Sequence, residues 1–173
     1  MPDDREHRFR QLYHEHYRTV QAYAVRRVAT PADVADVTAE VFTTAWRRLD
    51  DIPPPPSDRL WLYGVARRVV AGQHRTARRF RRLIRRIENN FPATPAYSEF
   101  HQNELLFTAL SSLPPGEREA LLLVTWEQLP HAEAARVLGC SANAVSIRVH
   151  RARARLREAL DAQATSARSG GLR

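Results

Sequence analysis

A chain of 173 residues, 43% hydrophobic and 27% charged, suits one or two small soluble domains and excludes fibrous, collagen-like and fully disordered proteins. All 27 basic residues are arginine, and they outnumber the 19 acidic residues to give a formal net charge of +8. This balance predicts an anionic partner, either nucleic acid or a membrane surface. The exclusive use of arginine favours planar, bidentate recognition of phosphate and guanine.

The residue inventory also argues against several kinds of site. The single cysteine, Cys140, excludes an internal disulfide framework and a cysteine-based zinc cage, which favours a reducing cytoplasm. His14 and His16 do not share a helix face, and no His-Glu-x-x-His spacing occurs. The amino terminus lacks the apolar run of a secretion signal, and no stretch is long enough to span a bilayer. We therefore expect a cytoplasmic protein without membrane insertion, metal or cofactor.

Helical periodicity dominates the first half of the chain, and the alternation typical of strands is absent. An apolar stripe over residues 9–28 predicts a first helix that ends near Ala29. Thr30, Pro31 and Asp33 are typical of the N-cap, first and third positions of a second helix. The expected buried side of this second helix consists of Val34, Val37, Val41, Phe42, Ala45, Trp46 and Leu49.

Four consecutive prolines follow the second helix. Residues 51–57 cannot continue a helix, because proline lacks a backbone N–H group and favours extended geometry. Ser57 and Asp58 are suited to cap a third helix. A polar, proline-broken segment between about Ile87 and His101 is typical of a linker. We place an N-terminal helical domain at residues 5–86 and a flexible linker at residues 87–102.

The second half repeats the helical pattern in shorter pieces. Apolar spacing predicts helices over residues 103–113, 117–127, 130–138 and 142–160. Gly139, Cys140 and Ser141 separate the last two as a tight turn followed by a serine cap. The polar, glycine-containing residues 161–173 are expected to be a disordered tail. The fold class is therefore all-α, with an N-terminal helical bundle and a C-terminal helix-turn-helix domain at residues 103–160.

The helix that starts after Ser141 has the pattern of a DNA reader. Val145, Val149 and Ala152 form a buried face, while the other faces are polar or basic. Residues in its first turns would reach base edges, and arginines further along would contact phosphates. The alternative is a solvated charged helix in an ordinary bundle. Five arginines with a single acid between Arg148 and Glu158 argue against that alternative.

Two further surfaces stand out on the predicted N-terminal domain. Residues 59–87 contain ten arginines, no acid, and the interleaved aromatics Trp61, Tyr63 and Phe80, a combination that suits single-stranded or opened nucleic acid. Placement of Trp61 in the core is the alternative reading for that residue. On the second helix, Asp33, Asp36 and Glu40 fall within about 60° of one another at 100° per residue.

That acidic strip has two interpretations, an ordinary solvated face or a surface for a basic protein partner. No catalytic constellation accompanies these surfaces, since a phosphate-cradling glycine loop and a Gly-x-Ser-x-Gly elbow are both missing from the sequence. We expect a binding protein with no catalytic residues and no small-molecule substrate.

Three segments in this order resemble the extracytoplasmic-function sigma factors, the small bacterial proteins that direct RNA polymerase to promoters. Residues 33–47 (DVADVTAEVFTTAWR) resemble the helix that binds core polymerase. Residues 61–79 (WLYGVAR through the arginines at 75, 78 and 79) resemble the segment that melts and reads the minus-ten element. Residues 113–156, with Leu113-Pro114, Trp126-Glu-Gln-Leu129, Leu138-Gly139 and Arg151-Ala-Arg153, resemble the domain that reads the minus-thirty-five element.

The resemblance implies site residues and partners. The implied partners are core RNA polymerase, promoter DNA and an anti-sigma factor. The implied polymerase contacts are Asp33, Asp36, Glu40, Phe42 and Arg47. The implied minus-ten contacts are Arg59, Trp61, Tyr63, Arg67, Arg68, His74, Arg75, Arg78 and Arg79. In the last domain, Asn143, Ser146, Ile147, His150 and Arg151 would contact the minus-thirty-five element, with bases read by the last four, and Arg118, Arg148 and Arg155 would bind phosphates.

Some positions depart from the family pattern. Arg68 replaces a common Asn, Gly72 a usual Asp, and Ala39 a usual Gln, while Pro130 stands where a Ser opens the scaffold helix. The four prolines replace a polar loop that helps relatives to choose the minus-ten base, so minus-ten preference is the least transferable inference. Two other functions remain open at this point: an autonomous helix-turn-helix repressor and a basic RNA-binding protein.

Overall fold

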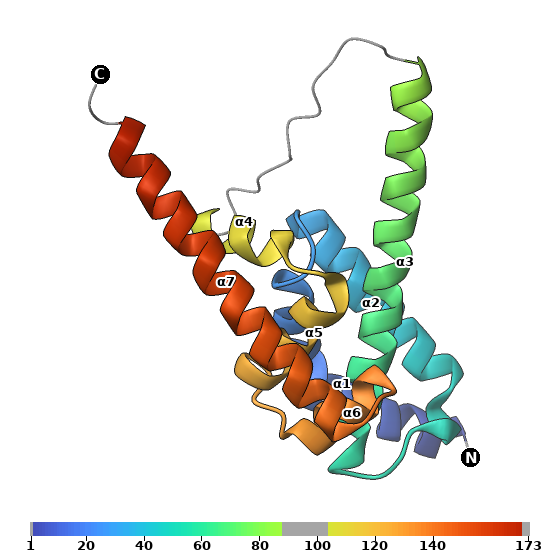
Figure 1. The fold of residues 1–173 in the computed structure, drawn as a ribbon. Coiled ribbons are helices and arrows are strands. Elements are labelled where there is room, and N and C mark those ends of the chain that lie inside the picture. Colours follow the sequence, from blue (N-terminus) through green and yellow to red (C-terminus); the bar gives the residue numbers. More distant parts are fainter. Residues whose placement is uncertain (1, 88–103, 171–173) are drawn as a thin grey trace. The chain divides into compact units, whose positions relative to one another are not determined.

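The computed structural model describes the backbone of residues 2–87 and 104–170 and the side chains of residues 4–76 and 105–162. The described residues form helices and no strand (Figure 1). The chain divides into two compact units, Met1–Phe100 and His101–Arg173. The expected all-α class with two helical domains is confirmed.

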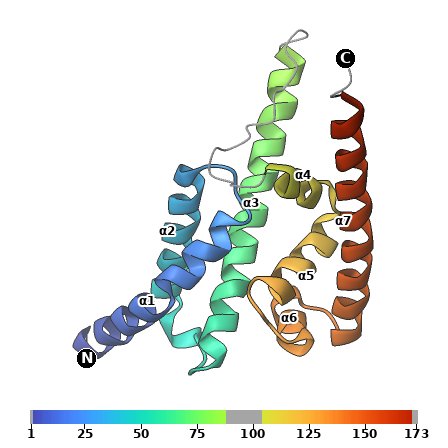
Figure 2. The same ribbon diagram turned by 90° about the vertical axis from the view of Figure 1, so that its left-hand side faces the viewer.

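Three long helices pack against one another in the first unit. They are α1 (Pro2–Val25), α2 (Pro31–Arg47) and α3 (Ser57–Ile87), with a short 3-10 helix, η1 (Leu49–Asp51), between α2 and α3 (Figures 1 and 2). Apolar side chains from all three helices meet in one core. Its least exposed members include Val20, Tyr23, Ala24, Val37, Val41, Ala45, Leu62 and Ala66.

The start of α2 follows the predicted capping pattern. The hydroxyl oxygen of Thr30 accepts a hydrogen bond from the backbone N–H of Asp33 at 3.0 Å and donates one to its carboxylate at 2.7 Å. Pro31 occupies the first helical position, where an N–H group would have no partner in the helix.

The end of α1 differs from the prediction. The helix ends at Val25 and not near Ala29, because the N–H groups of Arg27 and Val28 both turn back to the carbonyl of Ala24. Val28 is nevertheless only 4% exposed. Burial of this turn residue extends the apolar pattern past the last helical residue, and periodicity alone cannot separate the two.

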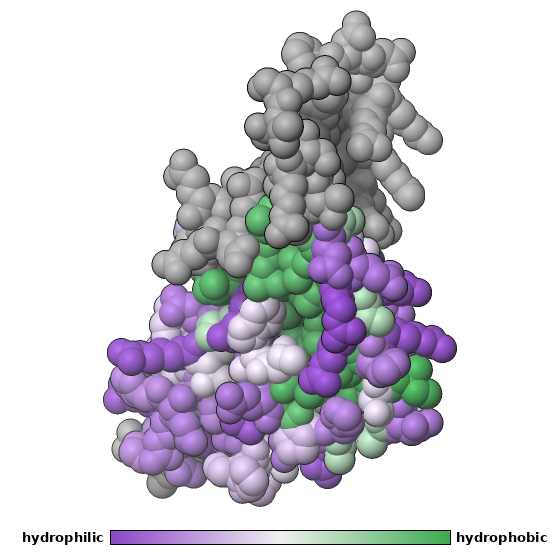
Figure 3. Space-filling model, turned by 60° about the vertical axis from the view of Figure 1, so that its left-hand side comes forward, coloured by the Kyte–Doolittle hydropathy of each residue, from purple (hydrophilic) through white to green (hydrophobic). Residues whose placement is uncertain are grey.

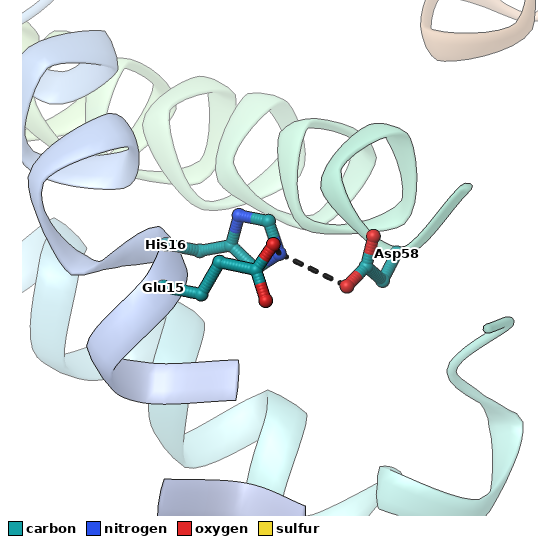
Figure 4. A group of neighbouring side chains, drawn as sticks. All are labelled: Glu15, His16 and Asp58. Atoms are coloured by element: carbon teal, nitrogen blue, oxygen red, sulfur yellow. Dashed lines mark hydrogen bonds and ion pairs between the residues drawn. The ribbon is translucent and has the colours of Figure 1, made fainter. Parts of the chain in front are cut away.

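A buried hydrogen bond joins the middle of α1 to the first turn of α3 (Figure 4). His16 Nε2 lies 2.9 Å from Asp58 Oδ2, and the two side chains are 7% and 6% exposed. Asp58 also accepts the backbone N–H of Arg59 at 2.8 Å through its other oxygen. Because an unpaired polar group is costly in this environment, the pair fixes where α3 begins relative to α1.

Arginines near the start of α1 bind the connection between α2 and α3. Arg5 donates to the carbonyl of Trp46 and to the carboxylate of Asp50, both at 2.8 Å. Arg8 donates to the carbonyl of Ile52 at 2.9 Å, directly before the four prolines. Together with the His16–Asp58 bond, these contacts attach both ends of the proline loop to α1.

The second unit contains α4 (Glu104–Ser112), α5 (Pro115–Thr125), α6 (His131–Leu138) and α7 (Ala142–Gly170). α7 packs against the other three helices. The buried side chains that line this core include Ala109, Ala120, Leu122, Leu123, Ala134, Val145, Val149 and Ala152.

The turn between α6 and α7 agrees with the sequence prediction. Gly139 has a φ of 66°, a left-handed conformation that favours glycine after a helix. The N–H of Cys140 bonds to the carbonyl of Ala135 at 3.1 Å. Ser141 then accepts the N–H of Ala144 at 3.1 Å and caps α7. The two helices and their short turn form a helix-turn-helix unit.

Two helix ends differ from the expected boundaries. α7 is helical to Gly170, where a disordered tail from residue 161 was expected. An existing helix adds one backbone hydrogen bond for each further residue, so α7 can continue past the residues that pack in the core. α3 reaches Ile87, and residues 88–103, which contain almost all of the expected linker, lie outside the described residues.

The exposed side chains agree with the charged composition of the chain (Figure 3). Hydrophilic side chains cover most of the described surface on the face drawn in Figure 3, with a smaller apolar area among them. None of the described helices combines the length and apolar character that crossing a membrane requires.

We predict that His16→Ala lowers the free energy of unfolding by about 3 kcal/mol, because it leaves the buried Asp58 carboxylate without its partner. The matched control is His7→Ala, an exposed histidine of the same helix, which should change stability by less than about 0.5 kcal/mol. Urea denaturation followed by circular dichroism measures both. Equal stability of the two variants would mean that the His16–Asp58 bond does not support the first unit.

Candidate protein and nucleic-acid interfaces

The acidic residues predicted on α2 lie away from its buried side. Val37 and Val41 are fully buried, whereas Asp36 and Glu40 are exposed. Asp33 is half-buried and accepts the Thr30 hydroxyl, so part of its hydrogen-bonding capacity is used in the cap. We call Asp36 and Glu40 the acidic ridge, because both carboxylates are available to a partner.

The two other implied polymerase contacts on α2 have different environments. Phe42 is 4% exposed, and its ring centroid lies 4.7 Å from that of Tyr13. Phe42 is therefore a core residue and not a surface contact, as its place in the apolar periodicity of α2 requires. Arg47 is exposed at the end of the helix and remains available.

An open groove of about 640 Å³ runs along the acidic ridge, between α2 and α3. Asp36 and Glu40 line it from α2, and Arg68 and Gly72 line it from α3. A Cβ atom at Gly72 would meet nothing within 4 Å, so glycine is not required there by packing. Two of the positions that depart from the family pattern thus face the acidic ridge.

The basic surface of α3 is only partly available. Tyr63 is 3% exposed, and its ring centroid is 5.4 Å from that of Tyr23, so this implied minus-ten contact belongs to the core. Trp61 is half-buried, with the Arg48 guanidinium 5.8 Å from its ring. Arg59, Arg68, His74 and Arg75 are exposed, Arg67 is half-buried, and the side chains of Arg78 and Arg79 lie outside the described residues.

The second unit places most of its implied DNA contacts on the outer side of α7. Val145, Val149 and Ala152 are buried against the other helices, which fixes the rotation of α7 about its axis. Ile147 is 43% exposed, so its apolar side chain is accessible on this side of α7. Other exposed residues of this face include Asn143, Ser146, His150, Arg151, Arg153, Arg155 and Arg157.

The three arginines expected to bind phosphate have different surroundings. Arg148 is half-buried and donates to the Cys140 sulfur at 3.6 Å, a contact that places it beside the helix-turn-helix turn. Arg118 is half-buried on α5. Arg155 Nε lies 3.6 Å from Glu117 Oε2, an ion pair between α7 and the first turn of α5.

One cluster within the described residues has the chemistry of a metal ligand set. Potential ligand atoms of Glu15, His16 and Asp58 lie within 4.8 Å of one another (Figure 4). The His16 nitrogen and the Asp58 oxygen that a metal would use are already bonded directly to each other at 2.9 Å. This arrangement is satisfied as a structural hydrogen bond, so we assign it no metal.

Sequence reasoning missed two neighbours of the predicted contacts. Arg48 lies near Trp61, and Glu117 pairs with Arg155. Arg48 follows α2 directly and precedes the proline loop, so no helical spacing relates it to Trp61. Glu117 and Arg155 belong to different helices, and only the packing of α5 on α7 brings them together.

Both units match known family models. A model described as Sigma-70 region 2 matches residues 12–89, and one described as Sigma-70, region 4 matches residues 103–156. The RNA polymerase sigma factor CnrH of Cupriavidus metallidurans is 34% identical over 155 residues, covering 82% of this chain and 81% of the relative. The RNA polymerase sigma-E factor of Streptomyces coelicolor is 32% identical over 149 residues, covering 84% and 82%.

Solved structures show the same fold. The sigma factor RpoE in complex with the anti-sigma factor NepR from Bartonella quintana has a TM-score of 0.70 at 24% identity, covering 88% of this chain and 96% of that one. The structure of CnrH in complex with the cytosolic domain of CnrY has a TM-score of 0.67 at 30% identity, covering 89% and 88%.

Proposed function

Because this chain belongs to the extracytoplasmic-function family of RNA polymerase sigma factors, we propose a division of labour between its two units. The protein binds core RNA polymerase and directs promoter-specific initiation of transcription. Neither an autonomous repressor nor an RNA-binding protein is favoured by these matches. The first unit would bind the polymerase and opened minus-ten DNA, and the second would bind duplex DNA at the minus-thirty-five element.

The acidic ridge is the proposed polymerase contact. Asp36 and Glu40 are exposed acids in a protein of net charge +8, so DNA is repelled from this part of α2 while a basic protein surface is attracted. Arg47 at the end of the same helix would add a contact to an acidic group of the partner. Asp33, which Thr30 holds at the start of α2, would add a further acidic contact to the polymerase.

The exposed basic side chains of α3 are the proposed contacts to melted DNA. Arg59, Arg68 and Arg75 would bind the backbone, and the half-buried ring of Trp61 offers a surface on which a base can stack. Arg67, His74 and the arginines at 78 and 79 extend the same proposal along α3. Arg68 and the neighbouring open position of Gly72 give this part of α3 more positive charge than the family pattern implies.

We propose that the outer side of α7 reads duplex DNA. The exposed polar and basic side chains opposite the buried face of α7 are the observation that supports this assignment. Ser146, Ile147, His150 and Arg151 would face base edges in the major groove, with Asn143 at the start of the helix. Arg118, Arg148 and Arg155 would bind phosphates and fix the register.

The further partners and the compartment are also proposals. A solved structure similar to this chain contains a sigma factor bound to an anti-sigma factor, and we propose that an anti-sigma factor binds this chain as well. We propose that the protein acts in the cytoplasm, where it would meet polymerase and promoter DNA. Catalysis would reside in the polymerase, and this chain would act as a binding protein without a metal, a cofactor or a small-molecule substrate.

Reversing the charge of the acidic ridge tests the polymerase contact. Asp36→Arg combined with Glu40→Arg should lower the affinity for core polymerase about 100-fold, because like charges would meet across the interface. Titration of labelled protein with purified core polymerase measures the affinity. Asp4→Arg combined with Glu6→Arg, on α1, makes the same change in net charge and should bind normally. Unchanged affinity of the α2 variant, with its helical circular dichroism spectrum intact, would refute the assignment.

Base and phosphate contacts should differ in their response to mutation. Arg151→Ala should weaken binding of the holoenzyme to its promoter about 10-fold to 100-fold and relax the preference at one base pair of the minus-thirty-five element. Arg155→Ala should weaken binding to every sequence alike. It should also reduce the slope of log affinity against log salt concentration by about one.

Competition binding across a randomised minus-thirty-five library measures both effects. Arg18→Ala, an exposed arginine of α1, is the charge-matched control. An unchanged base preference in the Arg151 variant would remove that residue from the proposed reading face.

A further inference from the structure

A nearly buried carboxylate lies against one of the proposed phosphate-binding arginines. Glu117 stands in the first turn of α5, and its side chain is 12% exposed. Its Oε2 atom is fully buried and has no hydrogen-bond partner among the described residues. The Nε atom of Arg155 lies 3.6 Å from it, close enough for an ion pair but too far for a hydrogen bond. The Arg155 side chain is 52% exposed on α7.

Burial of the Glu117 carboxylate favours its ion pair with Arg155. A buried carboxylate oxygen without a hydrogen bond is unfavourable unless a positive charge stays beside it. The amino-terminal end of α5 carries a partial positive charge, which attracts the Glu117 carboxylate in the first turn of the helix. The ion pair with Glu117 therefore favours one conformation of the long Arg155 side chain.

The orientation of the guanidinium matters for what Arg155 can bind. A guanidinium has five N–H donors arranged in a planar fork. Contact through Nε leaves the edge formed by the two Nη groups available, and that edge makes two parallel hydrogen bonds to a phosphate. The partial exposure of Arg155 leaves room for such a ligand.

We propose that Glu117 is a positioning residue for promoter binding: it fixes the Arg155 guanidinium so that the Nη edge meets the DNA phosphate backbone. The proposal rests on the function proposed above, in which the outer side of α7 contacts duplex DNA. A long arginine side chain loses much rotamer freedom when it binds. Fixing it before DNA arrives reduces that loss and raises affinity.

Simple electrostatics predicts the opposite sign for Glu117. Removing an acid from a DNA-binding surface ordinarily strengthens binding, since the acid repels phosphate. A positioning role predicts weaker binding on removal of the same charge. The direction of the change therefore separates the two roles.

The test is a double-mutant cycle on the complete holoenzyme, assembled from the full chain and core polymerase, with a duplex promoter as the probe. Glu117→Gln keeps the size of the side chain and removes its charge. We expect it to weaken promoter binding about fivefold at about 0.1 M salt when Arg155 is present. In an Arg155→Ala background the same substitution should change affinity by less than about 1.5-fold, because its effect passes through Arg155.

Two further variants make the cycle specific. Glu158→Gln removes the same charge from an exposed position of α7, and should leave affinity unchanged or slightly raise it. Glu117→Asp keeps the negative charge but shortens the side chain. A positioning role predicts that this variant binds the promoter more weakly, whereas a purely electrostatic role predicts unchanged affinity. Thermal unfolding of each variant shows whether the second unit stays folded.

Several outcomes would overturn the proposal. One such outcome is a Glu117→Gln variant that binds the promoter as tightly as the unmodified chain or more tightly. Another is an equal loss of promoter affinity with and without Arg155, which would indicate damage to the fold. An Arg155→Ala variant with unchanged affinity and salt dependence would instead remove the phosphate role of Arg155 and the positioning role with it. Normal weakening by Arg155→Ala without an effect of Glu117→Gln rejects the positioning role alone.

Discussion

Burial of one apolar stripe on each long helix determines where this protein carries its charge. On α2, the fully buried Val37 and Val41 place Asp36 and Glu40 on the outer side. On α7, the buried side chains likewise turn the arginines outward. Fully burying one such apolar side chain contributes about 1.5–3 kcal/mol, whereas a surface ion pair contributes about 0–1 kcal/mol. Core packing, and not attraction between surface charges, therefore orients the acidic ridge and the proposed DNA-binding side of α7.

Features that depend on a few neighbouring residues were predictable from the sequence. The Thr30 cap and the Gly139 turn were both anticipated, because each is specified within three or four positions of the chain. Helix ends that depend on packing or propagation were not. Val28 stays buried after α1 has ended, and α7 continues to Gly170 although the apolar stripe stops earlier. Apolar periodicity reports which residues are buried, and only indirectly where a helix stops.

Packing also overturned two of the roles that the family resemblance implied. Phe42 and Tyr63 were expected at interfaces, but both are buried among aromatic neighbours in the core of the first unit. Pairs between distant segments had no signal in the sequence at all, as for Glu117 with Arg155. Such pairs depend on how two helices pack, which neither local propensity nor spacing specifies. The exposed positions of the charged candidate residues such as Asp36 and Glu40 were predictable, whereas the contacts between distant helices were not.

An acidic surface on α2, a basic surface on α3 and a helix-turn-helix unit together support the proposed role of an adaptor between polymerase and DNA. In this role the chain gives core polymerase its promoter choice. Run-off transcription from a library of genomic promoter fragments, with purified core polymerase in the presence and absence of the chain, is the decisive measurement. Transcripts with defined start sites should arise only when the chain is present. Absence of such transcripts from every fragment, with the core polymerase active on a nonspecific template, would refute this role.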